Sequence, residues 1–180
     1  MEEYIEDMRL RGPEEIERGR KQKELMFRLS QTMPETPAYK EILQELFGDR
    51  LGEGSTVCAP IYGAALHKLI IGRNVYINPN LLAMARGGIT IEDEVQLAAN
   101  VQLISNNHDL YDRQILICRP ILIREGAWVG AGATIMPGVT VGRYAVVGSA
   151  AVVTKDVPDY GVAVGNPARV IKMLDPEKFR

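Results

Sequence analysis

The chain has 180 residues, enough for one domain with a substantial core and a short appendage. Its 21 basic and 23 acidic residues give a formal net charge of −2, without the basic excess that nucleic-acid binding requires, so we expect no nucleic-acid partner. No run of 18 apolar residues occurs and the N-terminus is charged, so we expect a soluble cytoplasmic protein that does not bind membranes.

Residues 1–52 show a helical period and predict a segment with two helices. The first spans about residues 14–29 and has an apolar stripe interrupted by many charges. The second begins after Thr36 as the cap, with Pro37 at its first position, and Gly48 ends it. The apolar residues are Ile16, Leu25, Met26 and Leu29 in the first helix and Tyr39, Ile42, Leu43, Leu46 and Phe47 in the second. Both stripes need another surface to pack on.

From about residue 57 a period of six replaces the helical period. Eleven of twelve residues at this spacing, which we call anchor positions, are Val, Ile or Leu, with two shifts of phase. A small or β-branched residue usually stands four places later, and glycine often follows the anchor. Such units favour short strands joined by tight bends, three of which make one coil of a triangular solenoid. The anchors are Ile71, Ile77, Ala83, Ile91, Leu97, Leu103, Ile123, Val129, Ile135, Val141, Val147 and Val153.

The spacing has one long interruption, at the polar stretch SNNHDL (105–110), which holds one of only two histidines. After Leu103 the next anchor, Ile123, comes 20 residues later, so a surplus of 14 residues must leave the solenoid as a loop at about 107–120. His108 lies where this loop begins. Loops on a rigid scaffold often carry working side chains, and an imidazole suits the removal of a hydroxyl proton. His108 is therefore the candidate general base, with the capping of a turn as its alternative role.

The repeated pattern of an aliphatic residue, glycine, two free positions and a small residue resembles the hexapeptide-repeat acyltransferases. The resemblance covers about residues 57–172 and is closest to the galactoside and maltose O-acetyltransferase branch. It implies a mainly β fold, a left-handed parallel β-helix forming a triangular prism at 53–172, with the N-terminal helical segment before it and a C-terminal cap and tail (173–180). It also implies a homotrimer with sites between subunits. The matching stretches are GRNVYINPN (72–80), GGITIEDEVQLAANVQLISNNHDL (87–110) and AWVGAGATIMPGVTVGRYAVVGSAAVVTKDVPDYGVAVGNPARVIK (127–172).

The resemblance implies an acetyl-CoA-dependent O-acetyltransferase in which His108 acts as the base and no metal takes part. No Ser-His-Asp or nucleophilic-cysteine motif occurs, so we expect direct attack on the thioester. Asn78 would stabilise the oxyanion, Tyr76 and Asp7 would contact the hydroxyl acceptor, and Arg86 would admit an anionic acceptor. The residues that the resemblance links to coenzyme A are Trp128, Ala131, Ser149, Thr154, Lys155, Arg169 and Lys172. Packing at the edge of a coil would account for the tryptophan equally well.

The sequence departs from this branch where the acceptor would bind. Ala85 and Arg86 stand in place of an acidic pair, and Ala64 stands in place of a serine. The arginine expected after Asp7 aligns with Ile16 or is shifted to Arg18. These changes leave the acceptor open, and an acetyltransferase of antibiotics, other xenobiotics or amino sugars is the alternative within the enzyme class.

Two alternatives belong to other classes. A zinc protein like the γ-carbonic anhydrases would need three imidazoles around the ion, whereas this chain has only His67 and His108, far apart, and no paired cysteines. A non-catalytic solenoid scaffold would need the aliphatic ladders but not the SNNHDL stretch, the loop and the TKDVP motif together. The group that orients His108 also stays open between a carboxylate, such as Asp109 or Asp112, and a backbone carbonyl.

Overall fold

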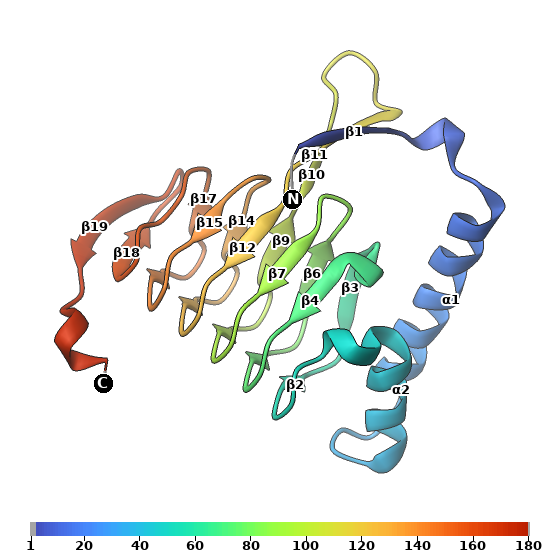
Figure 1. The fold of residues 1–180 in the computed structure, drawn as a ribbon, viewed down its shortest axis with the longest axis horizontal. Coiled ribbons are helices and arrows are strands. Elements are labelled where there is room, and N and C mark those ends of the chain that lie inside the picture. Colours follow the sequence, from blue (N-terminus) through green and yellow to red (C-terminus); the bar gives the residue numbers. More distant parts are fainter. Residues whose placement is uncertain (1–2, 180) are drawn as a thin grey trace.

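The first four coils after residue 51 each contribute three short strands to the prism, and the last coil has a single β-bridge at Val157 in place of the third strand. Strands of successive coils stack into three sheets (Figure 1). In the computed structural model, which describes residues 3–179, these sheets form the three faces of a prism. Face 1 contains β2 (Thr56–Val57), β5 (Tyr76–Ile77), β8 (Gln96–Leu97), β13 (Trp128–Val129), β16 (Val146–Val147), β18 (Gly161–Val164) and β19 (Arg169–Met173). Face 2 contains β3 (Ile61–Ala64), β6 (Leu81–Met84), β9 (Gln102–Ile104), β14 (Thr134–Ile135) and β17 (Val152–Val153). Face 3 contains β4 (Leu69–Ile71), β7 (Ile89–Ile91), β12 (Ile121–Ile123) and β15 (Thr140–Val141).

The core is the stack of anchors that the period of six predicts. All twelve anchor positions are buried, at 2% exposure or less, and the small or β-branched residues four places after them are buried too. Neighbouring coils exchange backbone hydrogen bonds, such as the one from Tyr76 N–H to the Val95 carbonyl at 2.9 Å. Strands within each face are parallel, apart from β19, which pairs with β18 in the antiparallel sense. The predicted parallel β-helix with an N-terminal helical segment is confirmed.

The second helix, α2 (Pro37–Phe47), forms as its sequence predicts. Thr36 caps it through a side-chain oxygen that accepts the Tyr39 N–H at 3.3 Å, and Gly48 ends it with a φ of +55°. Its whole predicted apolar stripe is buried. The helix therefore closes the open end of the β-helix, where the first coil has no neighbour.

The first helix, α1 (Pro13–Ser30), is only partly attached to the core. Leu25 and Leu29 are buried, but Ile16 is 63% exposed, so the predicted stripe is wrong at that position. Figure 1 shows the reason, because only the C-terminal half of α1 lies beside α2, while its N-terminal half extends toward β1. Short 3-10 helices complete the described chain: η1 (Met8–Leu10), η2 (Gly48–Arg50), η3 (Leu66–Lys68) and η4 (Pro176–Lys178).

The surplus residues between β9 and β12 leave the prism as a hairpin of β10 (Asn106–His108) and β11 (Ile115–Cys118). A strand that the sequence did not predict, β1 (Tyr4–Asp7), pairs with the other edge of β11 and gives a sheet in the order β1-β11-β10. This pairing satisfies backbone groups of β11 that would otherwise face solvent. The N-terminus is therefore fixed to the hairpin that carries His108.

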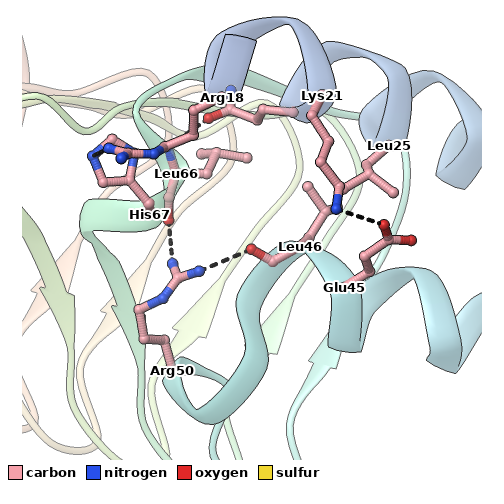
Figure 2. Close-up of a pocket in the computed structure, with 9 residues that line it drawn as sticks. Arg18, Lys21, Leu25, Glu45, Leu46, Arg50, Leu66 and His67 are labelled. Atoms are coloured by element: carbon pink, nitrogen blue, oxygen red, sulfur yellow. Dashed lines mark hydrogen bonds and ion pairs between the residues drawn. The ribbon is translucent and has the colours of Figure 1, made fainter. Parts of the chain in front are cut away.

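The helices are joined to the first coil around a small hollow (Figure 2). Lys21 of α1 bonds to Glu45 of α2 at 3.0 Å. Arg50 donates to the Leu66 carbonyl at 2.5 Å and to the Leu46 carbonyl at 2.9 Å, and so links α2 to η3. These contacts fix the orientation of both helices on the prism.

His67, in η3, lies in the same hollow. Its Nε2 is 3.4 Å from an Arg18 nitrogen, and its Nδ1 is buried without a hydrogen-bond partner among the described residues. Burial, and then the nearby positive charges of Arg18, Lys68 and Arg50, lower the pKa of His67. The ring is therefore held in its neutral form at pH 7.

We expect the Leu97→Ala variant to lose about 3 kcal/mol of unfolding free energy in urea denaturation, because it leaves a cavity in a fully buried ladder. Its neighbour Gln96 lies on the same strand but points outward. Gln96→Ala should therefore change the stability by no more than about 0.5 kcal/mol. Equal losses in the two variants would contradict the inward ladder.

Stability should also depend on pH through His67. Because its folded pKa lies below the unfolded value, the unfolded chain binds more protons once the pH falls below about 6.5, and stability declines there. We expect the thermal midpoint to fall between about pH 7.5 and pH 5.5, and to fall less in His67→Gln. An equal fall in both proteins would rule out His67 as the source.

Candidate functional site

The His108 side chain is oriented by the loop of its own hairpin. Its Nδ1 lies 2.5 Å from the backbone carbonyl oxygen of Arg113. A carbonyl only accepts hydrogen bonds, so Nδ1 carries the proton and Nε2 of the neutral ring keeps its lone pair. The ring is exposed, so this lone pair is open to a substrate. The orienting group is thus a backbone carbonyl, the second of the two possibilities that the sequence left open.

The two nearby carboxylates shape the loop instead of bonding to the imidazole. Asp109 Oδ1 accepts the backbone N–H groups of Tyr111 and Asp112, at 2.8 and 2.9 Å. These bonds lower the pKa of Asp109. Asp112 Oδ1 accepts the N–H of Gln114 at 3.0 Å. Both side chains therefore hold the turn in which Arg113 lies.

An open hollow of about 670 Å³ lies beside His108. It extends from the hairpin to the edge of the prism where face 2 turns into face 3, which we call the 2–3 edge. Ile117, Met136 and Pro137 give it apolar walls, and Thr154, a predicted coenzyme A contact, also lines it. The candidate base and one predicted cofactor residue thus share one hollow.

Tyr76 and Asn78 lie at a different edge of the prism. Asn78 is in the turn from β5 of face 1 to β6 of face 2, which we call the 1–2 edge. Its Nδ2 donates one N–H to the Leu97 carbonyl at 3.0 Å, which leaves a second N–H on that nitrogen. Tyr76 is 47% exposed on face 1. Because face 2 separates this edge from His108, one chain does not bring the predicted catalytic pair together.

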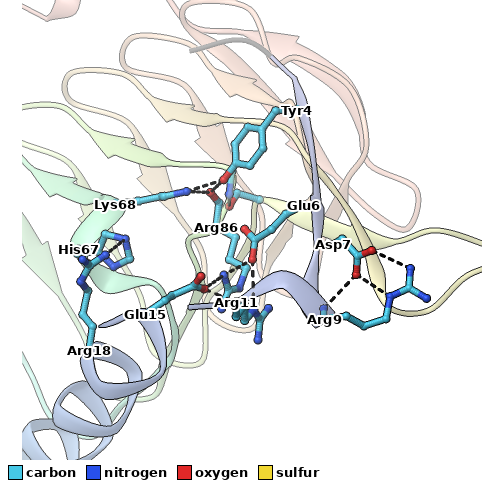
Figure 3. Close-up of polar contacts among 12 residues, drawn as sticks. Tyr4, Glu6, Asp7, Arg9, Arg11, Glu15, Arg18, His67, Lys68 and Arg86 are labelled. Atoms are coloured by element: carbon cyan, nitrogen blue, oxygen red, sulfur yellow. Dashed lines mark hydrogen bonds and ion pairs between the residues drawn. The ribbon is translucent and has the colours of Figure 1, made fainter. Parts of the chain in front are cut away.

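Arg86 lies at the 2–3 edge and is paired with acidic residues (Figure 3). It donates to Glu6 and, at 2.6 Å, to Glu15, and both carboxylates also lie within 3.4 Å of Arg11. The Arg86 hydrogen bond is the main cause of the lowered pKa of Glu15. These four side chains carry no net charge among themselves, so Arg86 is held in ion pairs. An anionic acceptor at Arg86 stays a prediction.

Three positions at which the sequence departs from the galactoside and maltose branch surround one hollow. Ile16, Ala64 and Arg86 all line a space of about 440 Å³ between α1 and the first coils. These three departures therefore alter the lining of one hollow.

Asp7, predicted to contact the acceptor, is at the end of β1 and is bound to Arg9. Its Oδ1 accepts from the backbone N–H and Nε of Arg9, at 3.0 and 2.8 Å, and its Oδ2 accepts from Nη2 at 2.8 Å. The side-chain bond is the main cause of the lowered pKa of Asp7. A contact between Asp7 and an acceptor stays a prediction.

Of the other predicted coenzyme A contacts, two lie next to Thr154. Lys155 and Arg169 line a hollow of about 180 Å³, together with Asp156. Lys172 is exposed further along β19. Because Thr154 lines the His108 hollow, the two spaces adjoin at this point of the chain.

The remaining three predicted cofactor contacts lie on face 1 or at the 1–2 edge. Trp128 is 53% exposed on face 1, and the strand pairing places it opposite Gln96, which lies opposite Tyr76. Ala131 and Ser149 are exposed in stacked turns of the 1–2 edge. Of the seven predicted cofactor residues, Thr154 and Lys155 thus follow face 2 toward the 2–3 edge, whereas the other five lie on face 1 or at the 1–2 edge.

Sequence reasoning missed the Arg113 carbonyl and the acidic residues around Arg86. Every residue offers a carbonyl, so no side-chain pattern could identify Arg113. Glu6 and Glu15 looked like ordinary surface charges of a helical segment. Glu6 reaches Arg86 through β1, which brings residues 80 positions apart into contact, and Glu15 reaches it from α1.

Within residues 3–179, no group of three or more His, Cys, Asp or Glu side chains is arranged to hold a metal ion. No helix in the described part of the chain is long and apolar enough to cross a membrane.

Comparison with solved structures gives close matches over almost the whole chain. A galactoside acetyltransferase in complex with coenzyme A is 31% identical, with 94% of this chain and 86% of that chain covered and a TM-score of 0.85. A maltose O-acetyltransferase from Clostridium difficile 630 is 32% identical, with 91% of this chain and 90% of that chain covered and a TM-score of 0.84. A hexapeptide-repeat acetyltransferase from Vibrio cholerae O1 biovar eltor, complexed with acetyl coenzyme A, is 32% identical over 91% of each chain, with a TM-score of 0.83.

A family model described as bacterial transferase hexapeptide (six repeats) matches residues 120–155. A search of curated proteins finds no significant match. The matched repeat covers coils on both sides of Trp128, and the structural matches cover the hairpin and the N-terminal helices as well. With identity above 30% over most of both chains, this protein belongs to the hexapeptide-repeat acyltransferases.

Proposed function

We propose that this acyltransferase moves an acetyl group from acetyl-CoA to a hydroxyl of a sugar or similar small molecule, with residues 53–172 as its catalytic unit. The observation that carries the proposal is the geometry of His108. Its Nδ1 proton is held by the Arg113 carbonyl, and the ring lines an open hollow with Thr154. Solved relatives with coenzyme A or acetyl-CoA bound support the choice of acyl donor.

The reaction transfers one proton from the hydroxyl to His108 and then returns it to the leaving sulfur. Nε2 of His108 takes the hydroxyl proton while the hydroxyl oxygen attacks the thioester carbonyl carbon. The resulting oxyanion accepts a hydrogen bond from the second Nδ2 N–H of Asn78. Collapse of this intermediate breaks the carbon–sulfur bond, and the leaving sulfur takes the proton back from the imidazolium. No covalent enzyme intermediate is required.

The separation of the predicted residues supports a site between two copies of the chain. One copy would supply His108, Arg86 and Asp7 from its 2–3 edge and hairpin, and its neighbour would supply Tyr76 and Asn78 from the 1–2 edge. Among the predicted cofactor residues, Thr154 lies beside His108 whereas Ala131 and Ser149 lie at the 1–2 edge, which fits this arrangement. A homotrimer in which each 2–3 edge faces the next copy's 1–2 edge would form three such sites.

The ion pairs of Arg86 and Arg11 with Glu6 and Glu15 favour an uncharged acceptor beside these four side chains. Arg20 and Lys23 also line the hollow. Paired carboxylates and guanidiniums can bind hydroxyl groups, which both donate and accept hydrogen bonds. The altered positions around this hollow also support the second candidate, an acetyltransferase of amino sugars or antibiotics, over a galactoside or maltose enzyme.

We expect His108→Ala to lower turnover by about two to four powers of ten, the usual contribution of a general base. Thiol release from acetyl-CoA should be followed with sugars, amino sugars and hydroxylated antibiotics as acceptors. The matched control is His67→Gln, the chain's other histidine, which should stay within about twofold of the unaltered protein at pH 7.5. Full activity in His108→Ala would exclude the proposed base.

Lys155→Ala and Arg169→Ala should each raise the KM for acetyl-CoA by about tenfold with kcat little changed, because a lost charged hydrogen bond weakens ground and transition states equally. With acetyl-dephospho-CoA as donor, the difference from the unaltered protein should shrink if these cations bind the 3′-phosphate. Lys40→Ala, an exposed lysine on α2, is the control. An unchanged KM in both variants would count against this cofactor site.

A further inference from the structure

The hairpin that carries His108 has few attachments to the prism near its tip. The residues between β10 and β11 form the exposed tip, where Tyr111 is 98% and Leu110 is 76% exposed. The carbonyl that orients His108 belongs to this tip. The position of the imidazole therefore depends on what holds the tip in place.

The strand β1 runs along the hairpin and is itself fixed to the prism at its first residues (Figure 3). The Tyr4 hydroxyl donates to the Arg86 carbonyl, and Lys68 donates to that hydroxyl at 2.6 Å. Glu6 is paired with Arg86, whose side chain is only 14% exposed. The strand is therefore a fixed reference against which the hairpin tip can be held.

Two contacts connect the end of β1 to the tip. The Met8 N–H donates to the Gln114 carbonyl at 2.9 Å. Arg9 donates hydrogen bonds to both carboxylate oxygens of Asp7 and also donates through Nη2 to Asp112 Oδ2 at 3.0 Å. Figure 3 shows the guanidinium of Arg9 against the Asp7 carboxylate, beyond the end of the strand.

Asp112 stands immediately before Arg113, whose carbonyl holds Nδ1 of His108. Its Oδ1 fixes the Gln114 N–H at 3.0 Å while its Oδ2 accepts from Arg9. The residues on either side of Arg113 are thus bound to the segment that directly follows β1. A shift of Asp112 would move the Arg113 carbonyl and turn the imidazole with it.

We propose that Arg9, held by Asp7 and bound to Asp112, is a positioning residue that fixes the hairpin tip and so aims His108. The inference rests on the proposed function of His108 as the base. An exposed ion pair adds little to global stability, so its effect should be on geometry. A small misplacement of a catalytic group can lower turnover severely without loss of binding.

The test compares Arg9→Gln, Asp112→Asn and the double variant. Asparagine keeps the oxygen that accepts the Gln114 N–H and removes only the acceptor for Arg9. We expect each single variant to lower kcat roughly fivefold to tenfold, with the KM for acetyl-CoA within about twofold and the thermal midpoint nearly unchanged. Because both variants break the same contact, the double variant should be no slower than the slower single one.

A matched control uses an ion pair at another edge. Arg73 donates to Asp93 at 2.6 Å where face 3 turns into face 1, so Arg73→Gln removes a comparable pair far from the hairpin. It should leave kcat unchanged. Amide hydrogen exchange gives a readout that needs no acceptor, because residues 109–114 should exchange faster in Arg9→Gln and Asp112→Asn but not in Arg73→Gln.

The outcomes separate this inference from the proposed function. If His108→Ala is inactive but Arg9→Gln and Asp112→Asn keep full kcat, the positioning role is wrong and the general base stands. Additive losses in the double variant would also overturn the inference, because they would show that the two residues act independently. If His108→Ala keeps full activity, the proposed function fails, and the positioning role fails with it.

Discussion

The burial of one aliphatic side chain every six residues is the constraint on which the rest of the structure depends. Each coil is too small to bury its own inward residues, so the ladders are covered only when successive coils stack in register. Val129, for example, is fully buried between Leu97 and Val147 on neighbouring coils. Extra residues cannot enter this stack without breaking the ladders. They can only leave it at an edge, as the hairpin from β9 to β12 does.

This constraint also decides where chemistry can occur. Inward positions are filled and the faces are flat, so the polar working residues lie at the edges and on the hairpin. The edges of one prism point away from each other, which explains why His108 and Asn78 do not meet within one chain. A rigid prism cannot bend to bring them together. The proposed site therefore requires association of copies, which rigid prisms can repeat with the same geometry.

The hairpin is the exception to this rigidity, and the N-terminal strand compensates for it. The strand β1 completes a small sheet with β11 and ends in the Asp7–Arg9–Asp112 contacts. It also brings Glu6 to Arg86, which pairs with Glu15 of α1 as well. The N-terminal segment thus affects both the orientation of the candidate base and the charge of the candidate acceptor surface, two properties that the repeats do not encode.

The sequence by itself determined the β-helix, its twelve buried anchors, α2 with its caps, and the residue that interrupts the repeat, because these follow from local periods and from residue types. Family resemblance, not the period, supplied the left-handed winding and the list of site residues. Only the tertiary structure decided that β1 pairs with β11, that Arg113 orients His108, and that Arg86 is balanced by Glu6 and Glu15. Contacts of this kind join distant segments through backbone groups and surface charges, which produce no periodic pattern in the sequence.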